Sequence, residues 1–145
     1  MIREYRKEDA QFYMDVGFNF SMLEVKEEHR GLFDDLLSPT HAFTCVVNGV
    51  PIGSGGVVPL WENVYEGWVI GSKLINKHKV YFAKSVKKGL EDLIEKLDII
   101  RLQTAIKENF PTGFRFAEWL GMENEGLMKK YDIYGNNCYR YARVK

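Results

Sequence analysis

The sequence predicts a mixed α/β domain whose sheet is mostly antiparallel and contains one parallel β-α-β crossover. Asn48-Gly49 between two β-branched runs is a strong hairpin signal. Two apolar runs, residues 64–74 and 99–106, flank an amphipathic helix, and strands joined by such a helix are generally parallel. The predicted order is β-α-α-β-β-β-α-β-α-β-β, and 145 residues fit one domain, 1–145.

The N-terminal part predicts one strand and two helices. Residues 2–6 alternate as a strand does, and Asp9 supplies an acidic cap for a helix over 10–16 that ends at Gly17. A stripe of leucines with Phe33 predicts a second helix over 26–37, and Pro39 stops it.

The middle part predicts three consecutive antiparallel strands. Residues 42–47 and 51–60 form the hairpin around Asn48-Gly49, and a turn at 61–63 leads into the strand 64–74. The return strand carries Gly53, Gly55 and Gly56. Glycines inside a strand indicate a bulge or a close approach of another chain segment.

The C-terminal part begins with a polar, basic break at 76–79. The helix that follows, over 80–97, has apolar residues at 3.6-residue spacing and lysines on its outer face. Its Gly89 lowers helix stability by about 1 kcal/mol relative to alanine and allows close packing on the sheet. After the strand 99–106, a short helix over 113–120 ends at Gly121, and a hairpin pairs 125–134 with 138–144.

Composition excludes several classes of protein. Twenty basic residues balance twenty acidic ones, which argues against a nucleic-acid-binding protein despite the lysine-rich stretch between Lys73 and Lys88. Cys45 and Cys138 are far apart and lack metal-ligand spacing, so no metal site is predicted. No apolar stretch has membrane-spanning length, and we expect a cytoplasmic protein without membrane contact.

The element order resembles the GNAT (Gcn5-related N-acetyltransferase) superfamily over essentially the whole chain. The segments that carry the resemblance are Ile2-Arg3 with Glu8-Asp9, Asn48-Gly49 with Ile52-Gly53, and Asn109 with Phe116 and Leu120-Gly121-Met122. A narrower similarity, to small GNAT-like proteins of tailed phages, is carried by Glu95-Lys96-Leu97-Asp98 and Gly113-Phe114-Arg115-Phe116. That similarity implies location in a host cytoplasm or in a virion.

The resemblance implies that the cofactor is acetyl-CoA or another acyl-CoA. Its pantetheine arm is expected beside a splayed strand, and its pyrophosphate at the amides that open the following helix. The implied coenzyme-binding residues are Trp68, Val69, Ile70, Gly71, Asn76, Lys77, His78, Lys79, Val80, Tyr81 and Asn109. The family's turn reads Gln/Arg-x-x-Gly-x-Gly/Ala, whereas residues 76–83 contain no glycine, so the pyrophosphate loop is degenerate. His78 is either a phosphate contact or an exposed turn residue, and Asn109 either caps the short helix or contacts coenzyme.

The resemblance also implies direct attack of a primary amine on the acyl thioester. A carboxylate near the central strands would take the amine proton, and Glu66 and Glu62 are the candidates by position. Backbone N–H groups of residues 69–71 would polarise the thioester carbonyl. The family's general-acid tyrosine falls at Ala117, and four tyrosines near the C-terminus are possible substitutes: Tyr131, Tyr134, Tyr139 and Tyr141.

Two functions follow from these observations. The first is acyl-CoA-dependent N-acyl transfer to an amine acceptor. The alternative is a catalytically inactive protein of the same fold, acting as a virion component or a protein-interaction module. The first requires that the strands 64–74 and 99–106 run parallel and diverge beside residues 68–71, which opens a slot near the start of the helix 80–97.

Overall fold

The computed structural model of the chain describes residues 1–21 and 41–145. The helix predicted over 26–37 lies outside the described residues. In chain order the elements are β1 (Ile2–Glu4), α1 (Lys7–Val16), β2 (Phe18–Ser21), β3 (Ala42–Val47), β4 (Val50–Trp61), β5 (Val64–Ser72), the 3₁₀ helix η2 (Lys73–Lys77), α3 (Lys79–Lys96), β6 (Arg101–Lys107), α4 (Pro111–Trp119), β7 (Glu123–Met128) and β8 (Cys138–Val144).

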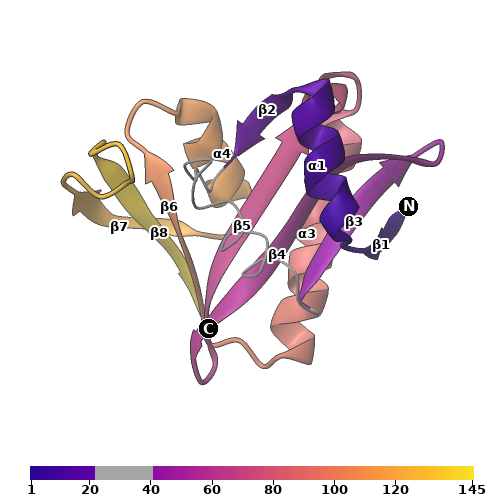
Figure 1. Cartoon of the computed structure of the whole chain (residues 1–145). Coiled ribbons are helices and arrows are strands. Elements are labelled where there is room, and N and C mark those ends of the chain that lie inside the picture. Colours follow the sequence, from indigo (N-terminus) through magenta and orange to yellow (C-terminus); the bar gives the residue numbers. More distant parts are fainter. Residues whose placement is uncertain (22–40) are drawn as a thin grey trace.

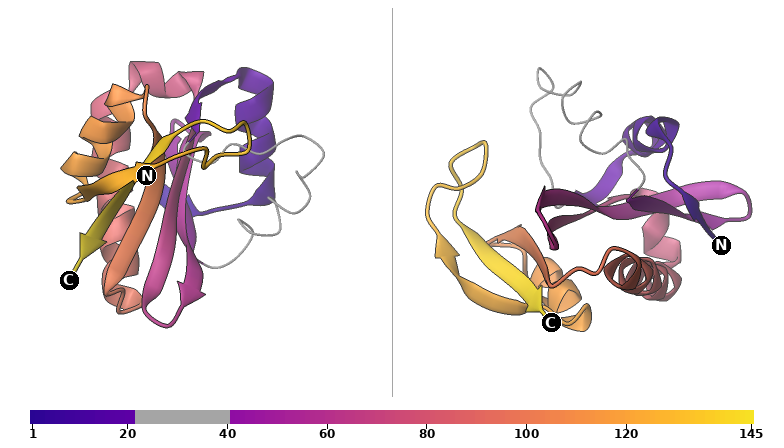
Figure 2. Two further views of the ribbon diagram at one scale, coloured as in Figure 1. Left: turned by 90° about the vertical axis from the view of Figure 1, so that its left-hand side faces the viewer. Right: turned by 90° about the horizontal axis from the view of Figure 1, so that it is seen from below.

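The described strands form one sheet in the order β1-β3-β4-β5-β6-β8-β7, and β2 adds to β5 outside this path. Only the β5–β6 pair is parallel among the strands of the described ranges. This confirms the predicted fold class, a mostly antiparallel sheet with one crossover through α3. Helix α1 covers one face of the sheet, and α3 and α4 cover the other (Figures 1 and 2).

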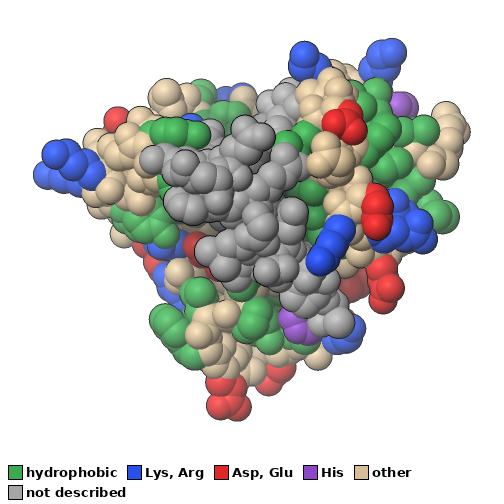
Figure 3. All heavy atoms as spheres, in the orientation of Figure 1, with side chains coloured by type: hydrophobic (Ala, Val, Ile, Leu, Met, Phe, Trp, Pro, Cys, Tyr) green, Lys and Arg blue, Asp and Glu red, His purple; other side chains and the backbone are tan. Residues whose placement is uncertain are grey.

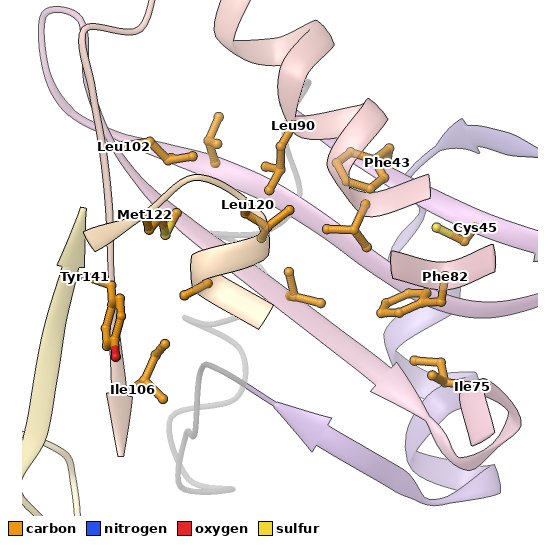
Figure 4. Close-up of a cluster of buried hydrophobic side chains, with 14 of the residues drawn as sticks. Phe43, Cys45, Ile75, Phe82, Leu90, Leu102, Ile106, Leu120, Met122 and Tyr141 are labelled. Carbon is orange, nitrogen blue, oxygen red and sulfur yellow. The ribbon is translucent and has the colours of Figure 1, made fainter. Parts of the chain in front are cut away.

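Two hydrophobic cores hold the layers together. The larger lies between the sheet and α3 with α4, where Phe43, Phe82 and Leu90 pack together (Figure 4). The smaller lies beneath α1 and contains Tyr13 and Trp68. Because side chains alternate along a strand, β5 contributes to both cores.

The N-terminal boundaries differ from the prediction. The first strand ends at Glu4 and α1 begins at Lys7, earlier than the predicted start at residue 10. The reason is that Asp9 lies inside the first turn and its carboxylate accepts the Arg6 backbone N–H at 2.9 Å. Gly17 ends α1 as predicted, with φ of 110°. The short strand β2 that follows was not predicted.

The hairpin β3–β4 confirms the Asn48-Gly49 signal, since both residues have positive φ, 51° and 78°. The glycines of β4 mark close approaches, as predicted. A Cβ on Gly53 would overlap the Phe82 ring, and a Cβ on Gly56 would lie 2.6 Å from the His41 carbonyl oxygen.

Strand β5 ends at Ser72 and not at residue 74. The Ser72 hydroxyl accepts the Leu74 backbone N–H at 3.2 Å and thereby caps η2, which includes residues 76 and 77 of the predicted basic break. Helix α3 and strand β6 are each displaced by one or two residues from the predicted 80–97 and 99–106. Helix α4 starts at Pro111, earlier than the predicted 113, because proline suits the first helical position.

The closing hairpin is shorter than predicted. Strand β7 covers Glu123–Met128, whereas 125–134 was expected. The chain leaves the sheet at residue 129 because the Asp132 carboxylate accepts backbone N–H groups of Tyr134 (2.9 Å) and Asn136 (2.7 Å), which closes a local turn. Among the described helices, none combines the length and apolarity needed to cross a membrane.

Candidate active site at the β5–β6 fork

Strands β5 and β6 start as a parallel pair and then separate. Val64 pairs with Arg101, Tyr65 with Leu102 and Glu66 with Gln103, and the pairing ends there. Both strands continue, β5 to Ser72 and β6 to Lys107, while β6 stays paired with β8 over its whole length. The predicted divergence beside residues 68–71 is therefore confirmed. We call this point of separation the fork.

The far end of β5 is already paired on the side that faces the fork. Gly71 pairs with Gly53 of β4 on one edge and with Phe20 of β2 on the other. Strand β2 runs antiparallel from Phe18, opposite Ser72, to Ser21, opposite Ile70 (Figure 1). Within the described residues, the fork-facing edge of β5 is left without a strand partner only at 67–69.

Glu66 lies at the last residue pair before the fork. Its side chain is 21% exposed, and Arg140 of β8 donates from Nη1 to both carboxylate oxygens at 3.2 Å. Burial raises the pKa of Glu66 above its ordinary value, while the charge and hydrogen bond of Arg140 act in the opposite direction. The outcome is a carboxylate at the fork that is more basic than an exposed one.

Further side chains support Glu66 from the neighbouring strands. Gln103, its partner on β6, hydrogen-bonds to it, and Arg101 Nε donates to the Gln103 amide oxygen at 2.9 Å. Arg101 in turn pairs with Glu125 of β7 at 2.5 Å. Because each acidic group has a cationic neighbour, this network fixes the Glu66 carboxylate in place.

Of the four candidate tyrosines, the structure brings one to this network. Tyr131 accepts a hydrogen bond from Arg140 Nη2 at 3.3 Å, and its ring lies 5.6 Å from the guanidinium. Tyr139 and Tyr141 instead pack against Phe114 of α4, and Tyr134 is 60% exposed in the β7–β8 loop. Ala117, where the family's tyrosine would fall, is completely buried.

The β5 residues predicted to contact coenzyme have buried side chains. Trp68 and Ile70 pack beneath α1, with Trp68 edge-on to Tyr5, and Val69 packs on the opposite face. Together with Gly71 they can therefore offer only backbone groups to a ligand in the fork.

The turn from β5 to α3 exposes most of the predicted pyrophosphate-binding residues. Asn76, Lys77, Lys79 and Val80 are exposed and His78 is half-buried. His78 joins the two helices, because its N–H donates to the Ile75 carbonyl and its carbonyl accepts from Phe82. The N–H groups of a helix's first turn have no partner inside the helix, so the start of α3 can accept an anion flanked by these lysines.

Tyr81 has a structural role that the sequence did not indicate. Its hydroxyl donates to the Val46 carbonyl at 3.3 Å and contacts the N-terminal amine of Met1. These contacts direct the Tyr81 side chain towards β3 and the N-terminus, beside the edge strand β1. The fork lies on the other side of β4.

Glu62 and Asn109 lie at opposite ends of the site. Glu62 is exposed in the β4–β5 turn, before the paired part of β5, so the structure does not bring it to the start of α3. Asn109 is exposed at the other end of β6. It does not cap α4, because the N-cap is Phe110, so that interpretation is wrong.

Sequence reasoning missed Arg140, Gln103 and Arg101. Each projects from its strand onto the same sheet face as Glu66. A charged residue in a predicted strand interior, such as Arg140 between Tyr139 and Tyr141, is the signal that could have identified them. Its partner, however, is set by the order of strands.

Two other observations bear on the chemistry available here. Residues 1–21 and 41–145 contain no cluster of three His, Cys, Asp or Glu side chains that could hold a metal ion. On the face shown in Figure 3, the basic and acidic side chains of the described residues are interspersed.

Solved structures with a similar fold include several acetyltransferases. Ard1 from Thermoplasma volcanium superposes with a TM-score of 0.80 at 14% identity, over 99% of this chain and 96% of that one. The F149A mutant of spermidine N-acetyltransferase SpeG from Vibrio cholerae gives 0.73 at 14% identity, over 99% and 94%. A GNAT-family acetyltransferase from Bacillus anthracis gives 0.69 at 19% identity, over 99% and 93%.

At these identities the likeness establishes the fold. No protein-family model matches the chain, and no curated protein matches its sequence. A shared fold alone does not assign a reaction to the chain.

Proposed function

We propose that this chain is an acyl-CoA-dependent N-acyltransferase that moves an acetyl group to a primary amine, with Glu66 as the general base. The observation that carries the proposal is the end of β5–β6 pairing at Glu66, which leaves a half-buried carboxylate of raised pKa at the mouth of a strand fork. A carboxylate of raised pKa accepts a proton more readily than an exposed carboxylate of ordinary pKa.

The residues around the fork fit acyl-CoA in part. No described strand pairs with the fork-facing edge of β5 at 67–69, which suits an extended ligand, and Lys77 and Lys79 flank the first turn of α3, where phosphates can bind. Bound acetyl-CoA would supply the acyl thioester. The edge at 70–72, however, is paired with β2, and the turn lacks glycine.

The chain's own groups have three tasks in the transfer. Backbone N–H groups in the region 69–71 would polarise the thioester carbonyl, which for residues 70 and 71 requires that β2 leaves their fork-facing edge. The amine forms the new C–N bond, the C–S bond breaks, and the thiolate leaves. Glu66 takes the proton from the amine nitrogen, directly or through a water molecule. Tyr131 or a neighbouring tyrosine is the candidate to protonate the thiolate, and Glu62 stays a more distant candidate base.

Replacing Glu66 by Gln tests the proposal. We expect kcat for acetyl transfer to a primary amine to fall by about 10² to 10⁴, the usual contribution of a positioned base, with acetyl-CoA affinity nearly unchanged. Glu62→Gln tests the alternative base in the same way and should retain activity if Glu66 takes the proton. Turnover by Glu66→Gln equal to that of the unsubstituted protein would remove Glu66 as the base.

A second function is favoured by β2 and by the closing hairpin. An inactive protein of this fold could leave β2 in the fork and use an exposed apolar surface to bind a protein, as a virion component or another assembly. The hairpin exposes Leu127, Tyr131, Ile133 and Tyr134. Absence of acetyl-CoA binding at millimolar concentration, with co-purification of a particle, would favour this function. The proposed setting of either function is the cytoplasm, or a phage-infected cell if the chain is phage-encoded.

A further inference from the structure

The fork-facing edge of β5 is shared by two partners. Strand β6 pairs with residues 64–66 and β2 with residues 70–72, while β4 pairs with the opposite edge. The Gly17 carbonyl also accepts the Lys73 N–H at 2.9 Å, so the contact continues past the end of β5. We propose that β2 is an internal competitor of acyl-CoA, which must displace it from β5 before the coenzyme can bind fully. This rests on the proposed function.

The competition follows from what a strand edge offers a ligand. The pantetheine arm is an extended chain with two amide groups, and such a ligand binds an edge through backbone N–H and C=O groups. Along 70–72 the edge is paired with β2. The remaining stretch, 67–69, covers only about 10 Å at about 3.3 Å per residue. An arm that continues from the fork towards the start of α3 therefore meets β2.

The structure also shows why β2 can leave without unfolding the domain. It has four residues, its register with β5 is interrupted between Phe18 and Phe20, and in the strand order it lies outside the main path of the sheet. Gly17, with φ of 110°, joins it to α1 and provides a turn that other residues rarely adopt. A short, irregular strand of this kind opens at low free energy compared with the core strands.

Occupation of the edge by β2 has a measurable consequence for binding. When only a fraction of molecules has the competent conformation, the apparent Kd rises by the inverse of that fraction. Weakening the β2–β5 pairing should therefore tighten acyl-CoA binding without changing any residue of β5 or α3.

The first experiment uses the unaltered full chain, with amide hydrogen exchange read by mass spectrometry. Saturating acetyl-CoA should increase deuterium uptake in residues 17–21, while residues 69–72 stay protected because the ligand replaces β2. Binding of acetyl-CoA with unchanged or reduced uptake in residues 17–21 would overturn the inference.

The second experiment compares two substitutions at one position. Phe20→Pro removes a backbone N–H and disfavours the paired strand, whereas Phe20→Ala removes the same ring and keeps the N–H. We expect the Kd of acetyl-CoA, measured by calorimetry, to be at least about tenfold lower for Phe20→Pro than for Phe20→Ala. If Phe20→Pro does not fold, the exchange experiment on the unaltered chain decides alone.

The outcomes separate this inference from the proposed function. Equal Kd values for the two variants would overturn the inference and leave the proposed function standing. No binding to either variant, although exchange shows that β2 has left β5 in Phe20→Pro, would overturn both.

Discussion

Replacing Gly89 by Ala tests whether helix α3 lies on the sheet as closely as the structure shows. Gly89 is buried, and a Cβ there would lie 2.6 Å from two atoms of the Phe43 ring. Phe43 has little room to retreat, because its ring packs so closely on Gly55 of β4 that a Cβ there would lie 2.9 Å from it. The contact between Gly89 and the Phe43 ring fixes how closely α3 packs on the sheet, and with it the position of the turn proposed to bind phosphates.

Two opposing effects decide the sign of this substitution. Alanine is better than glycine in a helix interior by about 1 kcal/mol. Overpacking a well-filled core costs about 1 to 3 kcal/mol. Because the Phe43 ring is confined between α3 and β4, we expect an overpacking cost in the upper part of this range. After the gain in helix propensity is subtracted, the free energy of unfolding should fall by about 1 to 2 kcal/mol.

Urea denaturation gives the free energy of unfolding that checks this expectation. Lys84→Ala, on the exposed face of α3, is the control and should change stability by less than about 0.5 kcal/mol. Shrinking the ring by Phe43→Leu should rescue Gly89→Ala, giving a coupling energy above about 0.5 kcal/mol in the double-mutant cycle. A more stable Gly89→Ala protein, or strict additivity with Phe43→Leu, would refute the reasoning.

The other predictions concern the buried Asp9 and Arg140, the ion-pair partner of the half-buried Glu66. Burial alone would raise the pKa of Asp9, but hydrogen bonds from Arg3, Thr44 and the Arg6 N–H together outweigh it and lower the pKa. The charged Asp9 therefore stabilises the fold at pH values above its ordinary pKa of 3.8. This contribution is lost as the pH falls through the lower pKa that Asp9 has in the folded protein. Asp9→Asn should cost about 3 kcal/mol at pH 7 and much less near pH 2 in urea denaturation, and a pH-independent loss would contradict this. Arg140→Gln removes a group that lowers the pKa of Glu66, so the acidic limb of kcat/KM against pH should move to higher pH. The exposed Arg115→Gln is its control, and an unmoved limb would show that Arg140 does not tune Glu66. These two join the predictions made above for Glu66→Gln and Phe20→Pro.

Local sequence patterns predicted the elements whose structure is set by near neighbours. The spacing of Val86 and Leu90 identified α3, and Asn48-Gly49 identified the β3–β4 hairpin. Boundaries were missed where one side chain bonded to the backbone close by, as Asp9 does in α1, Ser72 in η2 and Asp132 in the β7–β8 loop.

The candidate site was predicted only in part. The parallel pair followed from the crossover pattern and its divergence from the family resemblance, and Glu66, a candidate base by position, lies at the last residue pair before the fork. The ion pair with Arg140 was not predicted, because it joins strands whose adjacency depends on the order β5-β6-β8. The strand that carries Trp68 and Ile70 was predicted, but the burial of both side chains beneath α1 was not.

By itself, the sequence determined the order of the main helices and strands from β3 to β8, the hairpin at Asn48 and the absence of glycine from the turn before α3. These depend on backbone preferences and on apolar periodicity, which act over a few residues. Only the tertiary structure decided that β2 occupies the edge of β5 and that Arg140 pairs with Glu66. Both are contacts between segments far apart in the chain, and their free energy is gained only once the sheet has brought the partners together.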